Sequence, residues 1–400
     1  MEENKKQILK FPEGFLWGVA TSSHQTEGNN SNNDWWRWEE KGKTKESSGE
    51  ACDSYNKFRE DNQLVKDLGC GAFRISLEWS RIEPEEGVFS QEAIEHYQTI
   101  LFDLKEKGIK RVVTLNHWTL PVWFADKYGW NNFKAPKIFA RYCEKVIKDL
   151  GGEIDILITL NEPTIILNKG YLAGVFPPGQ KSIFAFKKAR RNMIKAHRKG
   201  YEVIKKYCPN TPIGITQYCN TFEFSGVLKI FNKLLKKFQI FYNWGFVRKN
   251  IEAHDFIGID YYASFVFSLK YPFVRRKTIN NHWTDMKWGI YPEGLYEVCM
   301  EAKTKFQKPV YIFENGLADK DDKHRTNFIK KHLFFVKKAI DEGADIRGYF
   351  YWSLLDNFEW NQGFEPRFGL VEVDYETLER KPRKSFYEYA KICQNNEVEI

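Results

Sequence analysis

The chain has 400 residues, of which 42% are hydrophobic and 16% aromatic, which is enough apolar material for a large buried core. Its 61 basic and 53 acidic residues give a formal charge of +8. We expect this modest excess to be spread over the surface, without the clustered basic footprint of a dedicated nucleic-acid binder. Seven scattered cysteines without a Cys-x-x-Cys pair suggest neither a disulfide framework nor a zinc site. The first residues contain no apolar segment like that of a signal peptide, and no apolar run is long enough to cross a bilayer. We therefore expect a reduced cytoplasmic protein.

Short, almost continuously hydrophobic runs recur along the chain, as is typical of parallel strands covered on both faces. There are eight: Phe15–Thr21, Ala72–Leu77, Arg111–Asn116, Asp155–Asn161, Ile213–Tyr218, Phe256–Tyr262, Val310–Asn315 and Gly348–Leu355.

Longer segments between these runs carry apolar residues at helical spacing and are predicted to be crossover helices. They include Ala93–Lys107, Ala135–Leu150, Ile183–Tyr207 and Thr326–Glu342. Eight βα units without a linker predict one α/β domain over residues 1–400, a (β/α)8 TIM barrel, with polar tails at about 1–10 and 394–400. An open doubly wound sheet would require a glycine-rich phosphate turn after an early strand, and the Gly69–Gly71 turn precedes its strand instead.

Polar and aromatic side chains gather where the predicted strands end, which is where barrel enzymes place reactive groups. Carboxylates, amides and indoles suit the hydroxyl groups and apolar faces of a sugar, and no phosphate cradle accompanies them. These residues are His24, Gln25, Glu27, Arg74, Glu78, Trp79, Asn116, His117, Trp118, Asn161, Glu162, Asp260, Tyr261, Tyr262, Glu314, Asn315, Trp352, Asp356, Asn357, Glu359 and Trp360.

Two glutamates, Glu162 and Glu314, directly close predicted strands four and seven, which lie across the barrel from each other. Cleavage of a glycosidic bond needs two such carboxyl groups, one protonated and one ionised. Arg74 is placed to keep Glu314 ionised, whereas Glu162 has no evident cation beside it, so its pKa is expected to be raised. A single glutamate at a strand end is more often a solvated residue than a catalytic one, and His117 or His197 alone would more often be a buried structural histidine. The hypothesis therefore depends on their coincidence.

Nine segments, in this order, resemble glycoside hydrolase family 1, the β-glucosidase and β-galactosidase family. The similarity covers nearly the whole chain. The segments are Phe11–Gly28, Phe73–Ile82, His117–Pro121, Thr159–Pro163, Asp255–Tyr262, Tyr291–Leu295, Ile312–Gly316, Gly348–Trp360 and Arg367–Gly369.

This resemblance implies a retaining β-glycosidase in which Glu162 is the acid/base and Glu314 the nucleophile. It also implies that Arg74, Asn161 and Tyr262 support catalysis, Asn161 by binding the sugar 2-hydroxyl. The implied substrate-binding residues are Gln25, His117, Trp118, Trp288, Trp352, Glu359, Trp360 and Phe368, with Trp288 on the aglycone side. No cofactor and no metal are implied, and the expected partner is a small glycoside or oligosaccharide, with no nucleic acid.

Three residues depart from the family pattern. Thr119 stands where an aspartate is common and is expected to tune only the rim of the site. Phe313 replaces a threonine before the nucleophile. Asp260 replaces an asparagine, which adds a carboxylate near Glu314 that is expected to perturb the pH profile. The connection between strands five and six is also short.

Several alternatives stay open at this point. No motif separates a hydrolase from a transglycosylase, and a 6-phospho-β-glycosidase is disfavoured by Glu359. A catalytically dead sugar-binding protein is disfavoured because both carboxylates and Arg74 are present. Gly226–Phe246 has the pattern of a basic amphipathic helix that could lie on a membrane, although a helix packed on the barrel explains it better. The number of subunits also stays open.

Overall fold

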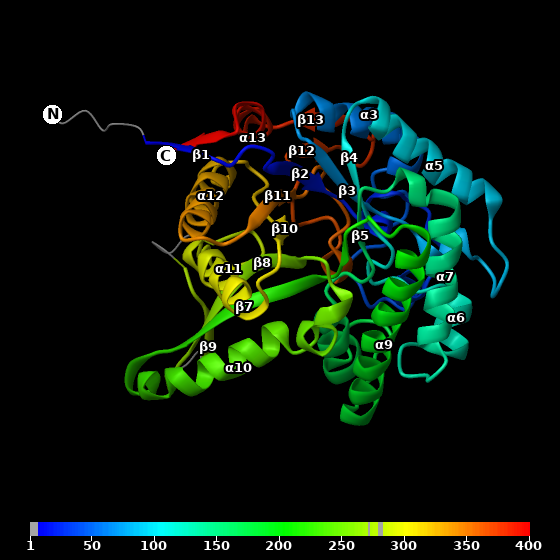
Figure 1. The fold of residues 1–400 in the computed structure, drawn as a ribbon, viewed down its shortest axis with the longest axis horizontal. Coiled ribbons are helices and arrows are strands. Elements are labelled where there is room, and N and C mark those ends of the chain that lie inside the picture. The colour runs from blue at the N-terminus through cyan, green and yellow to red at the C-terminus, as the bar shows by residue number, and fades with distance from the viewer. Residues whose placement is uncertain (1–6, 271–272, 279–282) are drawn as a thin grey trace.

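A computed structural model describes residues 7–270, 273–278 and 283–400. In these residues a parallel sheet follows the order of the chain and encloses the centre of the molecule (Figure 1). Its strands are β2 (Leu16–Ala20), β3 (Ala72–Ser76), β4 (Lys110–Thr114), β5 (Ile156–Ile158), β6 (Ile213–Gly214), β7 (Thr216–Phe224), β8 (Ile257–Phe267), β10 (Val310–Asn315) and β11 (Ile346–Trp352). The eight predicted strand segments are confirmed.

The barrel closes through its fifth strand, which Ile215 divides into β6 and β7. β6 pairs with β5 on one side, and β7 pairs with β8 on the other. At the opposite side of the barrel, β11 pairs with β2 in parallel, so the first and last strands also meet. The sheet is therefore the (β/α)8 barrel that the sequence predicts.

Helices cover the outer face of the barrel because each crossover must bury one apolar stripe against the strands. The larger ones are α3 (Ser54–Asp67), α5 (Gln91–Glu106), α7 (Ala135–Leu150), α9 (Ile183–Tyr207), α10 (Asn232–Trp244), α11 (Glu293–Phe306), α12 (Arg325–Asp341) and α13 (Lys384–Asn395). Short helices lie in the loops: α1 (Ser23–Thr26), α2 (Asp34–Glu40), α4 (Trp79–Ile82), α6 (Val122–Lys127) and α8 (Pro163–Ile166). None of the described helices is both long and apolar enough to cross a membrane.

The described residues of the two expected polar tails contain regular secondary structure. β1 (Ile8–Lys10) pairs antiparallel with β14 (Glu397–Glu399), and α13 continues to Asn395. Backbone hydrogen bonding therefore ties the two ends together, which residue polarity alone does not reveal. Three further short strands are β9 (Val274–Arg276), which pairs with β8, and the pair β12 (Val371–Val373) and β13 (Arg380–Pro382).

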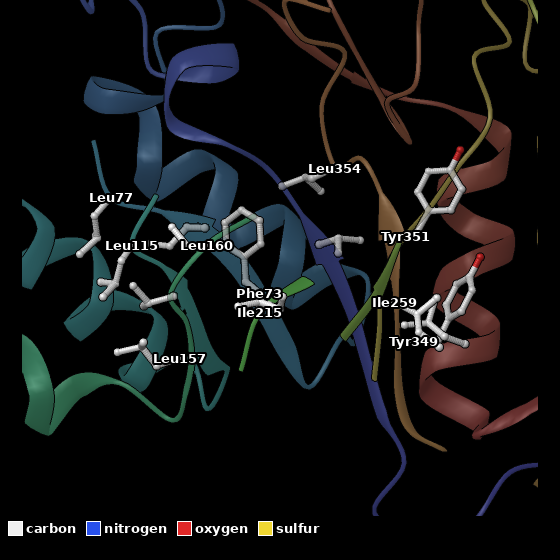
Figure 2. Close-up of a cluster of buried hydrophobic side chains, with 14 of the residues drawn as sticks. Phe73, Leu77, Leu115, Leu157, Leu160, Ile215, Ile259, Tyr349, Tyr351 and Leu354 are labelled. Atoms are coloured by element: carbon white, nitrogen blue, oxygen red, sulfur yellow. The ribbon is translucent and has the colours of Figure 1, made fainter. Parts of the chain in front are cut away.

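Alternation along the strands divides the core into two layers. The outer layer, between strands and helices, includes Phe73, Leu157 and Tyr349; Figure 2 shows these side chains and Tyr351 around the strands. The inner layer fills the barrel with Phe313, Phe350, Phe256, Leu16, Ala72, Val112, Ile156 and Ile158. This plug closes the barrel interior, so a polar site can exist only beyond it, at the carboxyl ends of the strands.

Candidate active site

Glu162 lies where β5 turns into α8. It has a left-handed backbone (φ 40°), and Pro163 occupies the first turn of the helix, where its missing N–H costs no hydrogen bond. The turn leaves the Glu162 carboxyl group buried, and its Oε1 has no hydrogen-bond partner among the described residues. A strained residue with an unpaired buried oxygen is typical of a functional position.

Glu314, near the end of β10, is held from two sides. Arg74 Nη1 donates to its Oε1 at 2.7 Å, and the Tyr262 hydroxyl donates to its Oε2, also at 2.7 Å. The Arg74 side chain is completely buried and also donates to Thr114 Oγ1 through its Nε. Both oxygens of Glu314 are therefore fixed in place by donors that favour the ionised form.

The two glutamates differ in electrostatic environment. Burial raises the pKa of Glu162 well above its usual value, and the nearby Glu314 and Asp260 carboxyls raise it further. Burial also raises the pKa of Glu314, while Arg74 and Tyr262 act in the opposite direction. The prediction that Arg74 lowers the Glu314 pKa is therefore correct for the effect of Arg74, but the net pKa is still raised, because burial outweighs it.

Asp260 adds a third carboxyl group to this cluster. One oxygen from each of Glu162, Asp260 and Glu314 lies within 4.8 Å of the others. Asp260 is fully buried, neither of its oxygens has a partner among the described residues, and burial followed by repulsion from Glu314 raises its pKa well above the usual value. Such a set could hold a divalent cation, but Arg74 already supplies a fixed positive charge against Glu314.

Asn161 joins Arg74 to His117. Its Oδ1 accepts from Arg74 Nη2 at 2.5 Å and from the Thr216 hydroxyl at 2.6 Å, so its Nδ2 points toward His117 Nε2, 3.1 Å away. Burial and the Arg74 charge lower the pKa of His117 well below its usual value, so the ring is neutral. With Nε2 accepting, Nδ1 carries the proton, and this buried donor has no partner among the described residues.

Gln25 and Glu359 meet on the other side of the pocket. Gln25 Nε2 donates to Asn357 Oδ1 and to the Phe358 carbonyl, both at 2.9 Å, and lies 3.3 Å from Glu359 Oε2. Burial raises the pKa of Glu359 to about 7, and the charge of Lys169 acts against this rise. The carboxyl group is thus shared between its two protonation states near neutral pH.

A cavity of about 600 Å³ lies among these groups and is lined by every predicted substrate-binding residue. His117 stacks on Trp352 and Trp360, with ring centroids 5.9 and 6.1 Å apart. Trp118 packs on Trp360 at 4.6 Å, and Trp288 packs against Phe368 and Tyr262. Flat aromatic walls with polar atoms between them suit a sugar ring.

Other strand-end residues do not join the cavity. His24 binds Glu39, Glu27 binds Arg81 and the Tyr97 hydroxyl, and Thr119 is buried with its hydroxyl on Glu78, away from the rim where we expected it. Phe313 belongs to the barrel plug, where the Arg74 guanidinium lies 5.8 Å from its ring. His197 binds Thr159 and lies against His254, which confirms its structural role.

Sequence reasoning missed part of the cavity wall, because it considered the ends of the predicted strands, and most of these residues come from extended strands, helices and loops beyond them. Lys169 comes from the π-helical turn Leu167–Ala173 after α8, and Arg276 from β9. The remaining lining residues that were missed are Ile165, Asn168, Phe176, Tyr218, Asn220, Phe222, Phe238, Tyr242, Phe265, Phe267, Met286, Asn361 and Gln362.

The fold and this site together define a barrel glycosidase: a carboxyl pair with different environments, in a pocket built to bind neutral, hydroxylated rings. Comparison with known proteins agrees. The sequence pattern of glycosyl hydrolase family 1 matches residues 7–224 and 248–398. The chain belongs to this family and is an O-glycosyl hydrolase.

Several relatives are similar over almost their full length. β-Glucosidase A of Thermotoga maritima is 34% identical, over 98% of this chain and 99% of its own. A β-galactosidase of Pyrococcus woesei is 29% identical, over 97% and 98%. Among solved structures, a β-glycosidase from Pyrococcus horikoshii has a TM-score of 0.90 and 40% identity, over 98% of this chain and 96% of its own. The Thermotoga maritima β-glucosidase in complex with glucoimidazole has a TM-score of 0.90 and 33% identity, over 97% and 99%.

Proposed function

We propose that the protein is a retaining β-glycosidase that hydrolyses terminal β-D-glucosyl residues, and also galactosyl or fucosyl residues. The observation that carries the proposal is the pair Glu162 and Glu314, whose nearest carboxyl oxygens lie within 4.8 Å of each other and whose environments differ. Inverting enzymes need about 6.5–9.5 Å between their carboxyl groups to admit a water molecule, whereas retaining enzymes need about 5–5.5 Å.

Glu314 is the nucleophile in this proposal, since Arg74 and Tyr262 hold both of its oxygens and stabilise the anion. Glu162 is the acid/base, because its raised pKa keeps a proton available for the leaving group. In the first step Glu314 bonds to the anomeric carbon while Glu162 protonates the departing oxygen. In the second step Glu162 removes a proton from water, the water oxygen bonds to the anomeric carbon, and the bond from that carbon to Glu314 breaks, which frees the sugar and the Glu314 carboxylate.

The groups that bind the sugar divide into two sets. Near the reacting carbon, Asn161 Nδ2 and His117 Nδ1 are donors for ring hydroxyls. Farther away, Gln25 and Glu359 can bind the hydroxyls at the opposite edge of the ring, because a carboxylate accepts from two of them at once. Trp352 and Trp360 are the platforms, and Phe368, Trp118 and Trp288 complete the aromatic wall.

Retention is tested by the anomer that forms first. With a nitrophenyl β-glucoside as substrate, we expect NMR to show β-glucose before mutarotation produces the α-anomer. Early α-glucose would exclude a double displacement. Added alcohol in the same experiment separates a hydrolase from a transglycosylase, since a transglycosylase would convert most of the substrate into the alkyl glycoside.

Phosphorylated sugars are predicted to be poor substrates. A 6-phosphate carries close to two negative charges and would face Glu359. Lys169 is close enough to affect Glu359, but it offsets only one charge. We expect nitrophenyl β-glucoside to be cleaved about tenfold faster or more than its 6-phosphate at equal concentration. Faster cleavage of the phosphate would overturn both the role of Glu359 and the substrate class.

Asp260 is predicted to shift the basic limb of the pH profile. Its charge raises the pKa of Glu162, so Asp260→Asn should lower that pKa and move the fall of kcat/KM to lower pH. Asparagine keeps the shape of the side chain, so the variant is expected to fold. A pH series of kcat/KM on an unactivated glucoside measures the shift, and an unchanged limb would mean that Asp260 stays protonated throughout.

A further inference from the structure

The segment Gly226–Phe246 does not pack on the barrel as its sequence suggests. We expected a helix whose apolar residues cover the strands. In the structure, Leu235, Trp244 and Phe246 of its apolar residues are buried, while Val227, Ile230, Phe231, Leu234, Phe238 and Phe241 are exposed. Figure 1 shows this part of the chain, η3 (Gly226–Phe231) and α10, along the edge of the molecule beside β7 and β9.

Polar groups of α10 contact the barrel beside these buried apolar residues. Gln239 Oε1 accepts from the Phe222 backbone N–H, and Asn243 exchanges two hydrogen bonds with the backbone of Asn220. Gln239 and Asn243 are one turn apart, so they occupy one face of α10. Leu234, Phe238 and Phe241 recur at i, i+4 and i+7 and form a second, exposed face beside it. Exposed apolar side chains at helical spacing, above a polar anchor, indicate a surface made for contact.

A groove of about 930 Å³ separates α10 from α9, and its charge is of one sign. Apolar side chains such as Phe186, Ile194 and Phe241 line it together with six basic ones, and no acidic residue lines it. The basic side chains are Lys187, Arg190, Arg191, Lys195, Arg198 and Lys249. In the part of the chain that the structure describes, α9 and α10 form ion pairs with acidic side chains only through Lys205 and Lys236.

The positive charge of the whole protein is concentrated here. Residues 183–207 and 226–249 hold fifteen Lys and Arg and one Glu, a net +14, whereas the complete chain carries +8. The remaining residues therefore carry −6. The expectation of an evenly spread excess is wrong, because the folded chain brings two basic segments, separated in sequence, to the two sides of one groove.

We propose that this surface, formed by η3, α10 and the facing side of α9, docks the enzyme on bilayers that contain anionic lipid. Apolar side chains flanked by lysine and arginine match the acyl boundary and the negative headgroups of such a bilayer. The exposed phenylalanines, with Ile230 and Leu234, favour lipid over a nucleic acid, which would be held mainly by the cations. Residues 225–247, which include η3 and α10, lie outside the segments that match the family pattern, whereas α9 lies within them.

Docking by this surface would turn the active site toward the lipid. Asn168, Phe238 and Tyr242 line both the groove and the cavity that contains Glu162 and Glu314. The test variants therefore avoid these three residues. Ile230, Phe231 and Leu234 lie on η3 and α10 outside the cavity, so their replacement leaves hydrolysis of a small aryl glucoside unchanged.

The experiment is sedimentation of the full chain with vesicles of equimolar phosphatidylglycerol and phosphatidylcholine, beside vesicles of phosphatidylcholine alone. The wild type binds the anionic vesicles, and added salt weakens this binding. The triple variant Ile230→Ser, Phe231→Ser, Leu234→Ser binds these vesicles at least about tenfold more weakly than the wild type does. A second triple variant, Lys187→Gln, Arg191→Gln, Lys195→Gln, loses a similar part of the affinity for anionic vesicles, because each cation is attracted by their negative surface potential.

Matched variants control for general loss of hydrophobicity or charge. The apolar control is the triple variant Val88→Ser, Phe102→Ser, Tyr387→Ser, which changes three exposed residues at α5 and on α13. The charge control is Lys338→Gln, Lys381→Gln, Lys384→Gln, which removes three exposed cations on α12, β13 and α13. Both controls bind as the wild type does. The proposal is overturned if the wild type does not bind the anionic vesicles or binds neutral vesicles equally well. It is also overturned if the Ile230 triple variant binds as well as the wild type. A wild-type dimer in sedimentation velocity that this variant dissociates would assign the surface to a second copy instead.

Discussion

Replacement of Glu314 by alanine is expected to abolish nearly all hydrolysis, by about four orders of magnitude or more in kcat. The covalent intermediate cannot form without this carboxylate, and Arg74 is left facing a small open space. Azide is small and anionic, so it can occupy that space beside Arg74 and attack the anomeric carbon. We expect azide to restore measurable turnover of an activated aryl glucoside and to produce the α-glucosyl azide.

The stability of this variant needs a separate measurement. Loss of one partner from a buried ion pair costs about 3–5 kcal/mol, so Glu314→Ala could lose activity by unfolding. Glu314→Gln keeps the shape and one hydrogen-bonding oxygen, and both variants should show a cooperative thermal transition. A folded Glu314→Ala with substantial activity and no response to azide would mean that another group is the nucleophile.

Replacement of Glu162 by glutamine is expected to remove the basic limb of the pH profile. The raised pKa of Glu162 means that the acid form persists to a higher pH, and kcat/KM falls as pH rises through that pKa. The acid limb belongs to Glu314, which must be ionised, and it should stay. A dinitrophenyl glucoside needs no proton for departure, so its cleavage lets the remaining profile be measured.

The leaving group supplies the internal control for this variant. Unactivated glucosides should lose about 10²–10⁴-fold in kcat/KM, whereas the dinitrophenyl glucoside should lose far less in the same preparation. A uniform loss across leaving groups would indicate misfolding or a binding defect. A basic limb that persists unchanged in Glu162→Gln would assign it to another group, and the nearby Asp260 carboxyl would be the first to examine.

Local patterns predicted the barrel because each of its units is locally consistent. Buried strands such as Val310–Asn315 begin with an apolar run and turn polar only at their carboxyl end, and the helices between them repeat at 3.6 residues. The carboxyl ends of parallel strands meet at one face of a barrel, so polar groups at strand ends, such as Asn161 and Glu314, could be placed in one site without coordinates.

Other parts of the site depended on distance and burial, which a sequence does not contain. The net pKa of Glu314 is one example, because the cost of burial exceeds the effect of Arg74. Lys169 and Arg276 are another, since a short helical turn and an added strand bring them to the cavity.

The sequence by itself determined the fold, the two candidate carboxyl groups and the family, because these follow from periodicity and from motifs that recur in a fixed order. Only the tertiary structure decided which face of α10 is buried. The helical pattern of that segment fits both a barrel contact and a membrane contact, and it favoured the barrel contact. Gln239 accepts a hydrogen bond from the backbone of β7, and Asn243 donates one to it, so Phe238 and Phe241 face outward, and the fold sets the cations of α9 opposite them. Contacts between segments distant in sequence fix that choice, and no local pattern records them.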